Sequence, residues 1–335
     1  MPIDSPNRRK FITRSACAAA VAAQAIARPT AGAQDAGFPS RPVRFVVPFP
    51  AGGTSDVIAR LFAQAMSPVL GQAIVIDNKP GAGTTIGAEF AARAPADGYT
   101  VIFTTSSPIT VAPHFQKVSY RAEQDFDPVA LVGDTPMMFV AAAAGSGPKT
   151  MKELIEHIRA RPGEVSAALT GNGTIGHLAM EMLRYSGKLD FQLVPYKGVS
   201  EAYNDLIAGR LTFGVDAPAS GMPHVKGGQL RALAVTSAQR INALPDTPTV
   251  AASGIPGFDM GFWMGILGPR GLPPAVNRKL AQAAFKAQED PALARRLADL
   301  GVEPRRIDGA QFAQVIHDEN EKWARLVKAT GATLR

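Results

Sequence analysis

The sequence predicts an α/β protein built on an open, mostly parallel β-sheet, or on two such sheets. Short apolar runs alternate with amphipathic segments along most of the chain, and turns rich in glycine and proline separate them. The chain has 335 residues, of which 46% are hydrophobic and 19% charged, so it can bury a sizeable core. This length is typical of two domains or of one large domain.

The first strand, turn and helix are clearly marked. Val43–Phe49 is a continuous apolar run that predicts a buried strand, and Pro50–Gly53 is a tight turn. In Thr54–Leu70, apolar residues recur at helical spacing on one face. Asp56 falls in the first turn of this helix, where the helix dipole favours an acidic residue.

The same strand–turn–helix unit then repeats toward the C-terminus. The further strands that we expect are Ile74–Ile76, Thr100–Thr104, Met137–Ala143, Val165–Leu169, Leu193–Pro195, Leu211–Val215, Ala232–Thr236 and Met264–Leu267. The further helices that we expect are Thr85–Arg93, Met151–Ala160, one from Thr174 to Ser186, Ser200–Ala208, and two or three after the last strand.

Residues 1–33 are typical of a twin-arginine signal peptide. Asn7–Thr13 contains consecutive arginines, Ser15–Ala27 is weakly apolar and rich in alanine, and Ala31–Ala33 offers a small-residue cleavage site. These three features come in the expected order. We therefore expect export to the periplasm and cleavage after Ala33.

The single cysteine, Cys17, limits the chemistry of the chain. One cysteine forms no disulfide framework and no CxxC metal site. Cys17 would carry a lipid in a lipoprotein, but Arg14 stands where a lipobox requires an aliphatic residue. A second alternative is that residues 1–33 form an amphipathic helix of the folded domain. Cleavage after Ala33 leaves a mature chain without a thiol nucleophile.

The net charge of +7 does not indicate a nucleic-acid-binding protein. Residues 1–33 contain five basic residues and one acidic residue, a net of +4, which leaves +3 for the rest of the chain. The remaining basic residues are scattered, without a basic run or a ladder of aromatic residues. No stretch reaches the ~20 strongly apolar residues of a membrane span.

The familiar catalytic motifs are not found in the sequence. Gly145–Thr150 resembles the end of a phosphate-binding loop, but Pro148 stands where that motif requires glycine. The chain has no G-x-S-x-G motif, and its five histidines form no HxH or HExxH pair. His177, at the start of an expected helix, is expected to be a structural hydrogen-bonding residue, with a ligand contact as the less favoured alternative. We therefore expect no enzyme, no metal and no cofactor.

Three strand-to-helix corners rich in glycine, serine and threonine form a candidate anion-binding site. They are Pro50–Ser55, Thr104–Ser107 and Thr170–Thr174. Small residues let the backbone approach a ligand closely, and the free N–H groups of a helix start favour an anion. In open α/β sheets such corners gather at the carboxyl ends of the strands. The alternative is that they are ordinary turns and helix caps.

The order of motifs along the chain resembles the solute-binding proteins of tripartite tricarboxylate transporters, the Bug family. The matching segments are Phe38–Arg44, Pro48–Asp56, Asp77–Gly83, Asp97–Thr100, Gly171–Thr174 with His177 and Leu178, Val194–Gly198, Leu230–Thr236 and Leu244–Val250. The resemblance implies a two-lobed periplasmic binding protein of the type II architecture, which delivers a small organic carboxylate to a membrane permease. It places one lobe in residues 38–136 and 257–335, and the other in residues 137–256.

The resemblance also assigns ligand contacts to ten residues from both lobes. They are Ala51, Gly52, Gly53, Thr54, Ser106, Ser107, Thr170, Asn172, Thr174 and Asp216. Backbone N–H groups and hydroxyls would pair the carboxylate, so no arginine is required. We expect Asp216 either to select the ligand or to organise its loop, because an ionised carboxylate beside an anionic ligand is repulsive unless it meets a donor.

Two positions depart from the family pattern. Ala51 stands where the family usually has a second proline, and Ala217 stands where a polar residue is common. The alanine at 217 leaves one fewer polar group for the distal end of a ligand, so the usual dicarboxylate preference does not follow. An extracytoplasmic carboxylate sensor with the same site is the alternative function. We expect a monomer.

Overall fold

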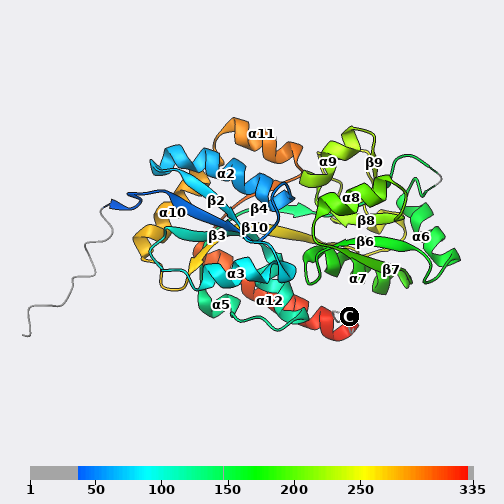
Figure 1. The fold of residues 1–335 in the computed structure, drawn as a ribbon, viewed down its shortest axis with the longest axis horizontal. Helices are drawn as coiled ribbons and strands as arrows, with labels where there is room; N and C mark the ends of the chain where they lie inside the picture. Colours follow the sequence, from blue (N-terminus) through cyan, green and yellow to red (C-terminus); the bar gives the residue numbers. More distant parts are fainter. Residues whose placement is uncertain (1–36, 146, 331–335) are drawn as a thin grey trace, which may run out of the picture. The chain divides into compact units, whose positions relative to one another are not determined.

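The computed structural model describes residues 37–145 and 147–330. The expected signal peptide and its cleavage site therefore lie outside the described residues. All the elements described below belong to the compact unit that begins at Pro39. They form two β-sheets with helices on both faces, as Figure 1 shows. We call each sheet with the helices packed on it a lobe.

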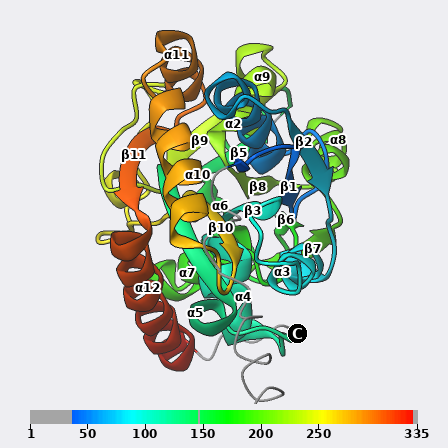
Figure 2. The same ribbon diagram turned by 90° about the vertical axis from the view of Figure 1, so that its left-hand side faces the viewer.

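The first lobe contains a six-stranded sheet in the order β11-β4-β10-β3-β1-β2. Its strands are β1 (Val43–Val47), β2 (Ile74–Asn78), β3 (Thr100–Thr105), β4 (Phe126–Pro136), β10 (Gly261–Pro269) and β11 (Glu303–Asp308). Its helices are α2 (Thr54–Leu70), α3 (Thr85–Ala92), α4 (Ala112–Phe115), α5 (Ala122–Asp125), α10 (Pro274–Ala287), α11 (Pro291–Asp299) and α12 (Gly309–Thr330). Helix α10 packs along α2, and α12 packs on β4 and β11 (Figure 2).

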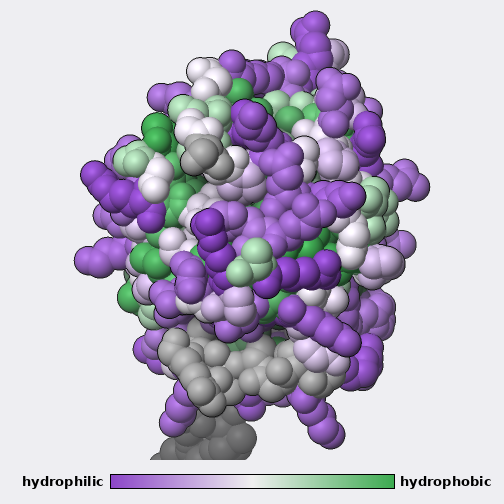
Figure 3. Space-filling model, turned by 90° about the vertical axis from the view of Figure 1, so that its right-hand side faces the viewer, coloured by the Kyte–Doolittle hydropathy of each residue, from purple (hydrophilic) through white to green (hydrophobic). Residues whose placement is uncertain are grey.

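The second lobe contains a five-stranded sheet in the order β7-β6-β8-β5-β9. Its strands are β5 (Met138–Ala142), β6 (Ser166–Thr170), β7 (Gln192–Tyr196), β8 (Phe213–Asp216) and β9 (Leu230–Val235). Its helices are α6 (Met151–Ala160), α7 (Ile175–Gly187), α8 (Val199–Ile207) and α9 (Pro218–Lys226). The end of the molecule that carries α6 is mostly covered by polar side chains (Figure 3).

The structure confirms the α/β fold class with two lobes, but the sheets are mixed instead of mostly parallel. Strands β1, β2 and β3 are parallel, as are β6, β7 and β8. Strand β10 runs antiparallel to both β3 and β4, and β5 runs antiparallel to both β8 and β9. The antiparallel strands β4, β5, β9 and β10 flank the segments that carry the chain from one lobe to the other.

The two crossing segments are hydrogen-bonded to each other at Thr236. Its hydroxyl accepts a hydrogen bond from the Met137 amide at 2.8 Å and donates one to the Met260 carbonyl at 2.7 Å. Its backbone bonds to the same two residues. Thr236 is fully buried. This residue therefore ties together the chain that enters the second lobe and the chain that leaves it.

Several elements, including the short helices α4 and α5, were not expected from the sequence, and three of them run against the local pattern. Strand β4 contains Pro128 and Gly133 and pairs with β10 through two irregularities in register, so it lacks a clean alternation. Strand β11 lies at the edge of the first sheet and is mostly exposed, with polar residues at four of its six positions. Helix α9 contains Pro223 inside the helix, which the sequence alone argues against. In each case pairing or packing outweighs local preference.

Candidate ligand-binding site

A cavity of about 910 Å³ lies between the two lobes, and we call it the cleft. Eight of the ten residues assigned to the site line it: Ala51, Gly53, Thr54, Ser107, Thr170, Asn172, Thr174 and Asp216. The three glycine- and hydroxyl-rich corners predicted from the sequence therefore meet at one cavity. The first lobe supplies two of these corners, and the second lobe supplies the third and Asp216.

On the first-lobe side, the turn before α2 is held by Asp56. One oxygen of this buried carboxylate, Oδ2, accepts hydrogen bonds from the Gly52 amide at 2.9 Å and from Arg60 Nε at 3.0 Å. The other, Oδ1, accepts one from Asn78 Nδ2 at 3.0 Å. Burial opposes ionisation, but the hydrogen bonds from Arg60, Gly52 and Asn78 outweigh it and hold the pKa of Asp56 below its usual value.

Gly52 and Ser106 are the two assigned residues that do not line the cleft. The amide of Gly52 is occupied by Asp56, so this glycine serves the turn, where its φ of +81° is one that glycine adopts easily. Ser106 is fully buried, and its Oγ has no hydrogen-bond partner in the described residues. The corner after β3 presents the hydroxyl of Ser107 to the cleft instead.

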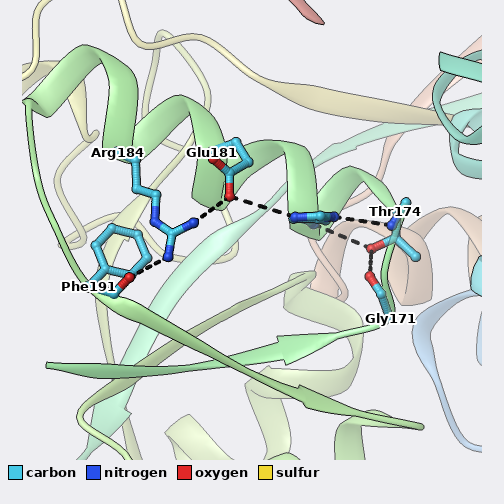
Figure 4. A network of polar contacts seen from close by, with 7 residues as sticks. Gly171, Thr174, Glu181, Arg184 and Phe191 are labelled. Carbon is cyan, nitrogen blue, oxygen red and sulfur yellow. Dashed lines mark hydrogen bonds and ion pairs between the residues drawn. The ribbon is translucent and has the colours of Figure 1, made fainter. Parts of the chain in front are cut away.

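On the second-lobe side, the loop before α7 is held by its own hydrogen bonds (Figure 4). The hydroxyl of Thr174 donates to the Gly171 carbonyl at 2.9 Å and accepts from the His177 amide at 3.4 Å. The Gly173 amide donates to His177 Nδ1 at 3.2 Å. Glu181 follows on the same helix, with its Oε1 3.7 Å from His177 Nε2. His177 is thus a structural residue that orients the loop, as expected.

The two lobes touch each other around the cleft. The Ile175 amide donates to the Ser107 hydroxyl at 3.1 Å, and the ring of Phe115 stacks on that of His177 with centroids 5.6 Å apart. On the α2 side, the hydroxyls of Thr54 and Ser220 lie 3.0 Å apart. The structure is therefore one in which the two sides of the cleft have come together.

Asp216 lines the cleft and is less exposed than Lys197 and Glu201, the other charged residues of the lining. It ends β8, and its Oδ2 accepts hydrogen bonds from the Tyr203 hydroxyl at 2.7 Å and from the Ser220 hydroxyl. Protein atoms surround the side chain, although the residue remains partly exposed where it lines the cleft. Burial raises the pKa of Asp216, and the hydrogen bonds from Ser220 and Tyr203 only partly offset that effect.

Five helices begin at the cleft, two from the first lobe and three from the second. They are α2 at Thr54, α3 after Thr84, α7 at Ile175, α8 at Val199 and α9 after Ala217. Their first-turn N–H groups and dipoles favour a negative charge. Among the described residues that line the cleft, Lys197 is the one basic side chain, and it is exposed. An anion held here would therefore be bound mainly by amides and hydroxyls.

The structure adds two segments to the site that the sequence reasoning did not assign. Pro80–Thr84 lines the cleft from the first lobe, and Pro195–Glu201 lines it from the second. Both overlap motifs that carried the family resemblance, and the first contains a glycine-rich turn after a strand. A glycine-rich turn after a strand was the pattern that predicted the other corners, and it could have predicted Pro80–Thr84 as well.

Two kinds of feature are not found in residues 37–145 and 147–330. No three His, Cys, Asp or Glu side chains come together there in a group that could hold a metal ion. None of the described helices is both long and apolar enough to cross a bilayer.

Two α/β lobes with a helix-lined cleft between them define a solute-binding protein fold. Residues 58–332 match the family described as "Tripartite tricarboxylate transporter family receptor", and the chain belongs to that family. The chain is 34% identical to Protein BugT of Bordetella pertussis over 304 residues, which cover 89% of this chain and 92% of that protein.

Solved structures of related proteins share the fold. The periplasmic binding protein BugD matches with a TM-score of 0.84 and 34% identity, over 89% of this chain and 100% of that one. MatC from Rhodopseudomonas palustris, with bound malate, matches with a TM-score of 0.81 and 32% identity, over 87% and 100%. R. palustris Rpa4515, with adipate, matches with a TM-score of 0.84 and 31% identity, over 89% and 100%.

Proposed function

We propose that this protein captures a small organic carboxylate in the cleft and delivers it to a tripartite membrane transporter. The observation that carries the proposal is the convergence of helix N-termini from both lobes on one cavity. A carboxylate placed there would accept hydrogen bonds from amides of α2 and from hydroxyls such as those of Ser107 and Thr170. Because these donors are neutral and fixed by the backbone, an arginine is not needed.

Related proteins support a carboxylate as the ligand. Two solved relatives that share the fold were obtained with malate and with adipate, both small carboxylates. The contacts between the lobes also fit a binding protein, because closure removes a ligand from solvent and creates a surface that only the loaded state presents. We propose the residue boundaries 38–136 with 257–335, and 137–256, for the two moving lobes.

A thermal-shift and calorimetric screen tests the carboxylate assignment. The probes are C3 to C6 mono- and dicarboxylates, with glucose and putrescine as neutral and cationic controls. We expect at least one acid to raise the melting temperature, because a ligand that binds only the folded state stabilises it. Stabilisation by glucose or putrescine and by none of the acids would overturn the proposal. Unchanged concentrations of the bound acid after long incubation would agree with binding without catalysis.

We also propose that the protein acts in the periplasm, exported by residues 1–33 and cleaved after Ala33. Replacement of Arg8 and Arg9 by lysine should hold the precursor in the cytoplasm, as fractionation and the mass of the mature chain would show. Periplasmic delivery of the double-lysine precursor would overturn the twin-arginine route.

Transport and sensing are distinguished by the partner of the loaded protein. Uptake of the labelled acid by vesicles that contain the permease subunits, only when the loaded protein is added, would support transport. Capture of a membrane signalling protein instead of a permease would favour the sensor. Size-exclusion chromatography with light scattering would test the expected monomer.

A further inference from the structure

The carboxylate of Asp216 has hydrogen-bond donors on its protein side and an open position toward the cleft. A carboxylate accepts about four hydrogen bonds. Tyr203 and Ser220 both donate to Oδ2, and the Ala217 amide also stabilises the ionised form. One acceptor position therefore remains for a group in the cleft that Asp216 lines.

The hydroxyls around Asp216 have no proton to offer to a ligand. The phenol of Tyr203 stays protonated, since burial and Asp216 raise its pKa, and its proton is directed at Asp216. The single proton of Ser220 points to Asp216 Oδ2, with the Ala217 carbonyl 3.1 Å from the same Oγ. Either acceptor keeps that proton within the second lobe.

The same hydrogen bonds fix the direction of the contact between the lobes. Because Ser220 uses its proton within its own lobe, the Thr54 hydroxyl must donate to Ser220 Oγ across their 3.0 Å separation. In this closed arrangement Thr54 Oγ1 presents lone pairs, not a proton, to the cleft. The end of the cleft that contains Asp216 is therefore rich in acceptors.

Neither Ala217 nor Lys197 offsets this excess of acceptors, and His224, which acts on Asp216 from α9, does not line the cleft. Ala217, which follows Asp216 and lines the cleft, provides a methyl group. Lys197 is exposed, so its ammonium is screened by solvent. A second ligand carboxylate at this end would meet lone pairs instead of donors, whereas a hydroxyl or ammonium would supply a proton to the open acceptor position.

We infer that the cleft selects carboxylates that carry a hydrogen-bond donor, a hydroxyl or an ammonium group, directed at Asp216. This inference rests on the proposed function, in which the helix N-termini hold the ligand's carboxylate. It makes Asp216 the specificity-determining residue and predicts discrimination against unsubstituted dicarboxylates. It also accounts for the closed contact at Thr54, which the same hydrogen-bond chain stabilises.

Acids of matched chain length test the inference. The probes are C4 and C6 acids that carry hydrogen, hydroxyl, ammonium or a second carboxylate at the far carbon: butyrate, 4-hydroxybutyrate, 4-aminobutyrate and succinate, with hexanoate, 6-hydroxyhexanoate, 6-aminohexanoate and adipate. Butyrates with the hydroxyl or ammonium at carbon 2 or 3 complete the C4 set. Affinities are measured by calorimetry at pH 7.5 with the mature full chain.

We expect a donor-bearing acid to bind on the order of tenfold or more tightly than both the unsubstituted acid and the dicarboxylate of the same length. If the protein binds 4-aminobutyrate or 6-aminohexanoate more tightly than the hydroxy acid of the same length, the group directed at Asp216 is an ammonium. The reverse order of affinities identifies it as a hydroxyl. Tightest binding of succinate or adipate to the native protein would overturn the inference while leaving the proposed function intact. Binding of no acid at all would overturn both.

Variants separate Asp216 from general charge effects. Asp216→Asn, whose amide can donate to a carboxylate, should lose the preference for donors and bind the dicarboxylate on the order of tenfold better. Asp190→Asn is the matched control, because Asp190 is exposed on the second lobe and does not line the cleft. An unchanged order of affinities in Asp216→Asn would contradict the inference. If Asp216→Asn does not fold, the order of affinities measured on the native protein still decides whether the inference holds.

Discussion

Gly83 of the first lobe lies directly against the backbone carbonyl of Asn172 in the second. A Cβ added at Gly83 would lie 2.1 Å from that oxygen, far inside van der Waals contact. The turn that carries Gly83 is held in place by Gln116, whose Nε2 donates to the Ala82 carbonyl at 2.8 Å. The closed arrangement of the lobes therefore requires a glycine at position 83.

Gly83→Ala should weaken ligand binding by on the order of tenfold or more, because the lobes cannot close fully around the ligand. Calorimetry with the tightest-binding acid measures the loss, and small-angle scattering should show a ligand-bound state more open than the native one. Gly209→Ala is the matched control, since Gly209 also has a positive φ, +71°, but nothing within 4 Å of an added Cβ. Equal affinities in the native protein and Gly83→Ala would disprove the role of this contact.

Asp56 should make a contribution to stability that depends on pH. Its folded pKa is lowered below the ordinary 3.8, so its stabilisation is complete above that value and is lost as the pH falls through the folded pKa. Asp56→Asn should lower the free energy of unfolding by about 1–3 kcal/mol near pH 7. Urea unfolding of the two proteins should give a difference that shrinks toward pH 3. A difference that is constant with pH would show that charge is not involved.

Thr236 should stabilise the junction between the lobes through its hydroxyl. Thr236→Val leaves the buried Met137 amide and Met260 carbonyl each without one partner, at a cost of about 1–3 kcal/mol. Thr236→Ser keeps the hydroxyl and removes one methyl group, at a cost of about 0.8 kcal/mol. Denaturant unfolding should therefore give a lower free energy of unfolding for Thr236→Val than for Thr236→Ser. The opposite order would assign the role of Thr236 to packing.

His177 should affect ligand binding through the hydrogen bond that its Nδ1 accepts from the Gly173 amide. His177→Ala removes this acceptor from the loop that lines the cleft, and the dissociation constant should rise about two- to tenfold. His177→Asn supplies an acceptor at a similar position and should recover part of the loss. His317→Ala, on the exposed surface of α12, is the control. Equal losses in the alanine and asparagine variants would point instead to the stacking with Phe115.

Asp216 should destabilise the ligand-free protein as the pH rises. Its folded pKa is raised, so the stability of the neutral form is present below the ordinary 3.8 and is lost as the pH rises through the folded pKa. The stability of Asp216→Asn relative to the native protein should therefore increase from pH 4 toward neutrality, as urea unfolding would show.

A change of background separates the effect of Asp216 from that of its titratable neighbours. His224 on α9 and Tyr203 on α8 are the titratable groups that act on Asp216. The comparison should therefore be repeated with His224→Gln. A pH trend that disappears in that background would assign the effect to the histidine.

Local pattern was sufficient to predict much of the fold. The helices Thr54–Leu70 and Met151–Ala160 were predicted with the bounds that the structure gives them, because an amphipathic face with clear terminal signals determines its own limits. Strands β4 and β11 were not predicted, since an irregular pairing and a polar edge are stabilised by their neighbours in the sheet. The mixed direction of the strands follows from how the chain passes between lobes, which no local pattern encodes.

The corners of the site follow from local sequence, because small residues at a strand end followed by a helix start expose amides wherever the rest of the chain lies. Which of those groups face the cleft depends on contacts between segments that are far apart in the chain. The carboxylate of Asp56 accepts the Gly52 amide hydrogen, so this amide is not available to a ligand. The Ser220 hydroxyl links Asp216 to Thr54 across the lobes. A hydrogen bond is directional and uses up its proton, so the chemistry presented to a ligand depends on partners that are distant in the chain.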